Sequence, residues 1–191
     1  MKLEIKTNFP DVAKQIKELH EDVANKATAR ALNATMAQAK TAMSREIRQK
    51  FVLSASKVNE SLRVNKAVAK NGLFQMEASL ESPSQRGRSL NLINFGARQT
   101  AKGVSVKISR DGGRKLIPGA FIGNDGRTVF KRVGKARLPI KALQTIDVAQ
   151  MFNTKKINQA VIAAINERFP VIFEREAKYY TDLFNQKRAG G

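Results

Sequence analysis

The chain has 191 residues, with 35 Lys or Arg against 16 Asp or Glu, and a formal net charge of +19. It has no cysteine, which excludes disulfides, thiolate catalysis and cysteine-ligated zinc. No apolar run approaches the roughly 18 residues of a membrane-spanning helix, and the charged N-terminus is unlike a secretory signal. The length and an apolar fraction of 42% predict a single domain, residues 1–191, with a real hydrophobic core.

The N-terminal third of the sequence predicts helices after a short strand or extended arm at residues 1–8. From Val12, apolar residues recur at spacings of three and four and continue through an Ala-rich run. This pattern predicts one long amphipathic helix to about residue 50, with a break near Asn33. Residues 54–64 predict a second, short helix. Because small side chains let another backbone approach closely, we expect the long helix to be an interface or core element through Ala31, Ala34, Ala39 and Ala42.

The middle of the chain alternates apolar and polar residues, which predicts strands. The segments with this pattern are Phe74–Leu80, Leu90–Phe95, Val104–Ser109, Leu116–Ile122 and Thr128–Arg132. Tight turns are expected at Asn71-Gly72, Asp111–Gly113 and Gly123–Gly126. Consecutive strands joined by tight turns indicate an antiparallel sheet. We also expect the turns at Gly96 and Gly134 to require glycine, because of a positive φ or a close backbone approach.

After Pro139 the periodicity becomes helical again. Asn153 or Thr154 can cap a helix with apolar positions at spacings of three and four, and Pro170 is expected to kink or restart that helix. The predicted fold class is therefore α+β, with a long N-terminal helix, a central antiparallel β-meander and C-terminal helices. Its parts are a helical N-terminal part, a basic antiparallel sheet and the C-terminal helices, at residues 1–65, 72–140 and 147–186 respectively.

Patterns typical of catalytic or metal sites are sparse. His20 is the only histidine and lies between acidic residues on a predicted helix, so the sequence supports no Ser-His-Asp arrangement. The acidic residues fall in helices at spacings that i,i+4 pairing explains, and no cluster has metal-ligand spacing. We therefore expect no catalytic, cofactor-binding or metal site, and no enzymatic activity.

Positive charge is concentrated between Ser82 and Ile146, a stretch with 14 Lys or Arg and two acidic residues. Cations flanked by glycine, with few aromatic neighbours, suit phosphate oxygens or an acidic protein surface rather than base-specific or single-strand recognition. Direct contact with DNA and balance against an acidic neighbour in an assembly both stay open at this point. The residues expected to form the anion-facing surface are Arg98, Lys102, Lys131, Arg132, Lys135 and Arg137, with Arg86 and Arg88 in a separate loop.

Several blocks of the sequence follow one another in a specific order and spacing. They are Leu92–Val106, Gly119–Ile122, Val129–Ile140 and Gln150–Phe152, with Ala29–Asn33 before them and Phe169–Glu176 after them. Together they resemble the minor tail protein Z family of long-tailed bacteriophages and prophages. The resemblance covers about residues 28 to 180, and the first 25 residues carry no part of it. The loop Gly123–Gly126 is shorter than in many relatives.

The resemblance implies a structural, non-enzymatic tail completion protein at the head-proximal end of the tail, in tail assembly or head–tail joining near the genome end. It implies other tail or neck proteins as partners and a position near the genomic DNA end, with direct contact to that DNA left open. The sequence itself gives no reason to expect a membrane partner. The rotational symmetry of tails implies a homo-oligomeric ring, for which six copies are the first guess, built through heterologous interfaces. The implied locations are the virion tail and, during assembly, the host cytoplasm. The alternative is a non-specific nucleic-acid-binding module, and a soluble enzyme is a more distant third.

Overall fold

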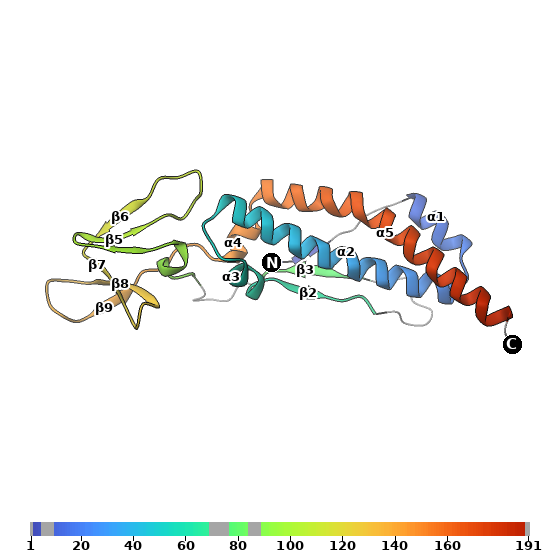
Figure 1. Ribbon diagram of the computed structural model, residues 1–191, viewed down its shortest axis with the longest axis horizontal. Helices are drawn as coiled ribbons and strands as arrows, with labels where there is room; N and C mark the ends of the chain where they lie inside the picture. The colour runs from blue at the N-terminus through green and yellow to red at the C-terminus, as the bar shows by residue number, and fades with distance from the viewer. Residues whose placement is uncertain (1, 5–9, 69–76, 84–88, 190–191) are drawn as a thin grey trace. The chain divides into compact units, whose positions relative to one another are not determined.

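The computed structural model describes residues 2–4, 10–68, 77–83 and 89–189, and it confirms the α+β class (Figure 1). The chain forms two compact units. Unit 1 comprises Met1–Met43, Leu62–Glu81 and Asn158–Gly191, and unit 2 comprises Ser44–Ser61 and Ser82–Ile157. The expectation of a single domain stays a prediction.

The core of unit 1 lies where three helices meet: α1 (Pro10–Glu18), α2 (Glu21–Lys50) and α5 (Lys155–Ala189). Its buried residues are Val12 on α1, Ala27 and Ala31 on α2, and Phe169, Ile172 and Phe173 on α5. The small side chains of α2 leave room for the aromatic side chains of α5, so the helices interdigitate at close range. Figure 1 shows α2 and α5 running alongside each other in this unit.

Unit 1 also has a three-stranded antiparallel sheet, in the order β1 (Lys2–Glu4), β3 (Ser79–Glu81), β2 (Arg63–Asn65). The central strand buries Leu80 completely. The segment after β2 is tied to α2 by the carboxamide of Asn33. Its Nδ2 donates to the Ala67 carbonyl at 2.9 Å, and its Oδ1 accepts from the Ala67 N–H at 2.8 Å.

Three helix predictions need correction. The break lies at Leu19 and His20, between α1 and α2, and α2 continues through Asn33 because that carboxamide bonds to Ala67 instead of competing for the helix backbone. The short helix α3 (Ala55–Glu60), capped by Ser54, ends earlier than expected, because the next residues pair with β3 as strand β2. Helix α5 is continuous through Pro170, so the restart does not occur there, and the kink stays a prediction.

Unit 2 has two three-stranded antiparallel sheets rather than one continuous meander. The first has the order β4 (Arg98–Thr100), β5 (Gly103–Val106), β6 (Lys115–Pro118), and the second has β7 (Ala120–Gly123), β8 (Thr128–Arg132), β9 (Ile140–Ala142). The end of α2 joins the first sheet, since the Val52 N–H donates to the Ile108 carbonyl and the Arg110 N–H to the Lys50 carbonyl, both at 2.9 Å. Buried side chains of this unit include Phe95, Val104, Val129, Met151 and Phe152.

Two of the expected strands of unit 2 are also different. The segment expected as the strand Leu90–Phe95 forms a 3₁₀ helix, η1 (Leu92–Phe95), because Asn91 caps its N–H groups and Gly96 ends it in the left-handed conformation. The expected strand Leu116–Ile122 is split into β6 and β7 by Gly119, at φ +70°. After β9, the capping box of Asp147 and Gln150 begins the short helix α4 (Val148–Phe152).

Other expectations fall partly or wholly outside the described residues. Of the expected strand Phe74–Leu80, the described part contains β3, whereas the Asn71-Gly72 turn and the loop cations Arg86 and Arg88 lie outside.

Of the two glycine predictions, one is confirmed and one is wrong. Gly96 has φ +58° and requires the left-handed region, as expected, but Gly134 does not: its φ is ordinary and a Cβ there would meet nothing within 4 Å. The more demanding position is Gly103, which the sequence reading did not single out. It has φ +149°, and a Cβ would lie 2.1 Å from the Ile117 carbonyl oxygen across the β5–β6 pairing.

We therefore expect Gly103→Ala to destabilise unit 2 by about 1–3 kcal/mol, since the added methyl group meets backbone that cannot move without breaking the sheet. The measurement is thermal unfolding followed by circular dichroism. Gly113→Ala is the matched control, because Gly113 has open space around it and no positive φ. A melting temperature for Gly103→Ala equal to that of the control would contradict this reading.

Candidate anion-facing surface

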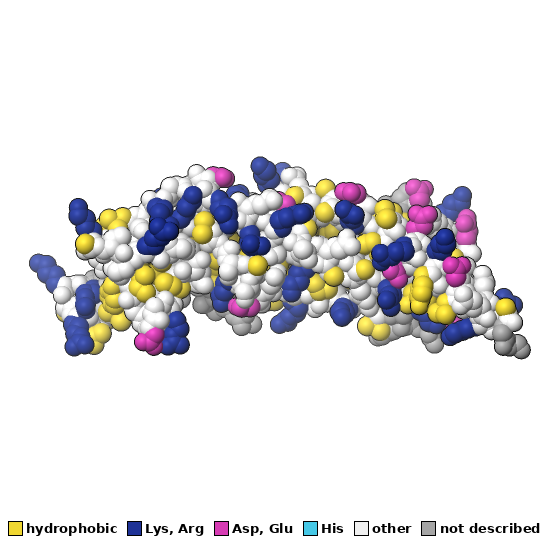
Figure 2. Space-filling model, viewed as in Figure 1, with side chains coloured by type: hydrophobic (Ala, Val, Ile, Leu, Met, Phe, Trp, Pro, Cys, Tyr) yellow, Lys and Arg dark blue, Asp and Glu magenta, His cyan; other side chains and the backbone are white. Residues whose placement is uncertain are grey.

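The charge of the chain is divided unequally between the two units. Lys and Arg outnumber Asp and Glu by 20 to 5 over the sequence of unit 2, and by only 15 to 11 over that of unit 1. On the face shown in Figure 2, Lys and Arg prevail over the β-strands of unit 2, whereas acidic side chains are frequent over the helices of unit 1. The anion-facing surface therefore has to be sought on unit 2.

Strand β8 supports the most basic part of this unit, and Asn91 holds it in place. The Asn91 Oδ1 accepts from the Val129 N–H at 2.8 Å, and its Nδ2 donates to the Val129 carbonyl at 3.2 Å. The same Oδ1 accepts from the Ile93 N–H at 3.0 Å and so caps η1. One carboxamide thus fixes the middle of β8 to the 3₁₀ helix that buries Phe95.

Strands β8 and β9 form a hairpin (Figure 1). Every residue of its outer part, residues 131–141, is exposed. Its register places Lys131 directly opposite Lys141. Like charges in directly opposite positions of an antiparallel pair repel each other. No carboxylate of the described chain lies within ion-pair distance of either lysine, nor of Lys135 or Arg137 in the loop. The hairpin therefore presents a concentrated positive charge that the described chain does not neutralise.

Arg132 has a different role from its neighbours. Strand alternation directs it to the opposite face from Lys131, where its guanidinium lies 5.5 Å from the centre of the Phe121 ring. Its Nη1 donates to the carbonyl of Arg137, and the Val133 N–H donates to the Pro139 carbonyl at 3.1 Å. These contacts join the two sides of the hairpin loop. Arg132 therefore stabilises the conformation of the loop in addition to contributing a positive charge.

The structure does not gather all six expected cations together. Lys102 lies in the β4–β5 turn, and its carbonyl accepts from the N–H of Gly119, next to the β7 residue that pairs with Lys131. Arg98 is exposed on β4 but is directed away, because the alternate residue Gln99 is the one that faces β7 and accepts from the Ile122 N–H at 2.8 Å. The surface thus comprises Lys102 and the hairpin cations, with Arg98 apart.

The carboxylates of unit 2 are largely committed to local partners. Asp125 pairs with Arg127 at 2.9 Å, and Asp147 caps α4. Lys57 donates to Glu60 at 3.0 Å, and this hydrogen bond, with a weaker one from Ser56, lowers the pKa of the Glu60 carboxyl. These acids therefore leave the charge of the hairpin unopposed.

The surface predicted from the sequence did not include Lys141, which strand pairing brings opposite Lys131. It also did not include two exposed apolar side chains, Val133 and Leu138. The signal was present in the segment from Lys131 to Lys141, where cations and aliphatic residues are interleaved without a single acidic residue. Strand register was needed to place them, because the sequence alone does not say where β9 begins.

Comparison with known proteins decides the identity of the chain. The sequence model of the family described as "Prophage minor tail protein Z (GPZ)" matches residues 10–187. The chain belongs to the minor tail protein Z family. No curated protein and no solved structure gives a significant match. The match begins at residue 10, so the expectation that the first 25 residues carry no part of the resemblance is wrong: α1, which contributes Val12 to the core of unit 1, is part of the family fold.

Membership in this family gives the protein a structural role in the phage tail. Among the described residues, no cluster of three or more His, Asp or Glu side chains could hold a metal ion. Within the same residues, no helix combines the length and the apolar character that crossing a bilayer needs.

The four alanines expected on an interface helix lie inward in this tail protein. Ala31 is a core residue of unit 1, Ala34 packs against that core, and Ala39 and Ala42 are buried. Their small side chains therefore serve the packing of the chain itself. A role of α2 as an interface between subunits stays a prediction, and it would have to use other positions of the helix.

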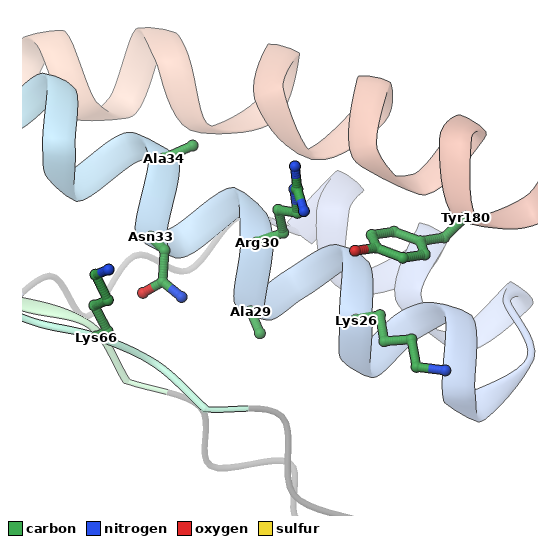
Figure 3. A pocket seen from close by; sticks show the side chains of 7 residues that line it. All are labelled: Lys26, Ala29, Arg30, Asn33, Ala34, Lys66 and Tyr180. Atoms are coloured by element: carbon green, nitrogen blue, oxygen red, sulfur yellow. The ribbon is translucent and has the colours of Figure 1, made fainter.

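A second basic feature is an open pocket of about 480 Å³ in unit 1 (Figure 3). It is lined by Lys26, Ala29, Arg30, Asn33, Ala34, Lys66 and Tyr180. Arg30 is paired with the buried Glu176 at 3.3 Å, and Asn33 is occupied by Ala67. Figure 3 shows the amino groups of Lys26 and Lys66 at opposite ends of the pocket, so its cations do not converge on one ligand position.

We expect Asn91→Asp to loosen the hairpin, because a carboxylate still accepts hydrogen bonds but no longer donates to the Val129 carbonyl. The Val129 carbonyl keeps its hydrogen bond from the Leu143 N–H at 2.9 Å, so the loss should cost about 0.5–1.5 kcal/mol. Hydrogen exchange of the β8 and β9 amides measures the effect locally, and protection should fall. Asn59→Asp, an exposed change on α3, is the control. Unchanged protection of the Val129 amide in Asn91→Asp would show that Asn91 does not hold β8.

Proposed function

We propose that this protein is a tail completion protein that acts at the head-proximal end of the phage tail, in tail assembly or head–tail joining. The family match supports the tail role, and the observation that carries the finer proposal is the uncompensated charge of unit 2. A minor tail protein with one strongly basic unit suits a position beside something acidic, either a neighbouring tail or neck protein or the genome end.

In the same proposal, copies of the chain form a ring that matches the rotational symmetry of the tail, and the protein catalyses no reaction. A ring requires heterologous contacts, in which one surface of each copy meets a different surface of the next. Electron microscopy of tails made with and without the chain tests the position: density that is lost at the head-proximal end supports it, and loss at the distal end overturns it.

Charge reversal tests the surface. Replacing Lys131, Lys135, Arg137 and Lys141 with Glu should lower the yield of infectious particles at least about tenfold, since like charges placed against an acidic neighbour cost several kcal/mol. The fold should persist because all four side chains are exposed. The matched control reverses four exposed lysines of unit 1, Lys14, Lys17, Lys178 and Lys187. Equal yields from the two variants would refute a special role for the hairpin.

The alternative function, a non-specific nucleic-acid-binding module, is favoured by the same basic surface. About four phosphate contacts would give a slope of about −3 to −4 for log affinity against log salt. Titration of the purified protein against duplex DNA at two salt concentrations measures this slope. No binding at low salt removes direct DNA contact by the isolated chain.

A further inference from the structure

The tip of the β8–β9 hairpin combines its charge with exposed aliphatic side chains. Val133 and Leu138 are each 67% exposed, and Ile140 is 39% exposed. Single exposed aliphatic residues are ordinary, but three within one short hairpin form a local apolar feature. Val133 directly follows β8, Leu138 lies in the same loop, and Ile140 is opposite Arg132 in the register, so these aliphatic side chains come from the segment that also carries Lys131, Lys135, Arg137 and Lys141.

Phosphate contact alone does not account for this composition. Duplex backbones are bound by charge and hydrogen-bond donors, and aliphatic side chains gain nothing from phosphate oxygens. Aliphatic anchors surrounded by a charged rim are instead typical of protein interfaces, where the anchors fill pockets and the rim provides orientation. From Lys131 to Lys141 the hairpin has five cations and no acidic residue, so a surface that complements it is acidic.

The hairpin is also prearranged for docking. Arg132 packs on the Phe121 ring and bonds to the carbonyl of Arg137, and the Val133 N–H bonds to Pro139. At its base, Asn91 fixes β8. A surface element that is ordered before binding loses less conformational entropy on association. The tip is therefore built as a rigid anchor rather than as a loose basic arm.

We propose that this hairpin docks into an acidic-rimmed apolar groove on a neighbouring tail protein. Val133 and Leu138 fill the groove, and Lys131, Lys135, Arg137 and Lys141 pair with carboxylates on its rim. Docking also relieves the repulsion between Lys131 and Lys141, because each gains a negative partner. This inference rests on the proposed tail function and identifies the kind of partner that the basic surface meets.

The test uses the full-length protein and, as the probe, purified tails assembled without it. Val133→Ser with Leu138→Ser leaves every charge in place and should weaken binding to these tails at least about tenfold, because two buried aliphatic anchors are lost. The matched control, Val68→Ser with Val171→Ser, makes the same type of change at side chains that are 65% and 64% exposed in unit 1. All four side chains are exposed, so both variants should fold, which thermal unfolding checks.

The outcomes separate the inference from the function on which it rests. If the wild-type chain binds the tails and the tip variant binds equally well, the docking inference is overturned and the tail function stands. If the wild-type chain does not bind the tails, both are overturned. Duplex DNA and vesicles of phosphatidylcholine with phosphatidylserine are parallel probes. A tip variant that loses vesicle binding but keeps tail binding would indicate a lipid surface and refute the protein groove.

Discussion

The architecture of unit 2 depends on one side chain that takes the place of a peptide group. The carboxamide of Asn91 offers a donor and an acceptor in the geometry of a backbone amide, and it uses both on Val129 while it also caps η1. Val129 is buried within β8, so this contact positions the rest of the strand together with its pairing to β7 and β9. Asn33 bonds to Ala67 in the same two-point way in unit 1, so an asparagine carboxamide ties down an extended segment in each unit.

The inner and outer halves of β8 differ in how far their side chains are buried. Towards its base, β8 needs apolar residues and paired backbone groups, which Val129 and its partners provide. Towards its tip, Arg132 closes the hairpin through Phe121 and the Arg137 carbonyl, whereas no comparable contact with the described residues is made by Lys131. Lys131 lies directly opposite Lys141, an arrangement that costs stability, and within the described chain no carboxylate lies within ion-pair distance of either lysine.

The sequence predicted the order of helices and strands because those patterns are local. The helix of Val12, the Gly123–Gly126 turn and the final helix follow from spacing and turn chemistry, whereas the tight turn expected at Asp111–Gly113 is wrong, because residues 107–114 form a longer connection between β5 and β6. Its errors fall where a contact distant in sequence decides the local structure. Asn33 predicts a break until its bond to Ala67 is known. The segment before Gly96 looks like a strand, but Asn91 caps it as a 3₁₀ helix, and the carboxamide that does so is held by Val129, 38 residues away. The basic surface was predicted by composition, whereas strand register decided which cations share a face and separated Arg98 from them.

The charges of the hairpin also explain why its exposed aliphatic side chains need not cause the free protein to self-associate. The exposed aliphatic residues of the hairpin are interspersed with lysine and arginine in the sequence, and mutual repulsion between the tips of different copies opposes self-association. A surface of opposite charge replaces this repulsion with attraction. Attachment should therefore weaken as salt rises, through screening of the rim, while the apolar contacts persist once the tip is seated. A surface of this kind keeps copies apart until an acidic partner is present, which suits a protein added to a structure that is already assembled.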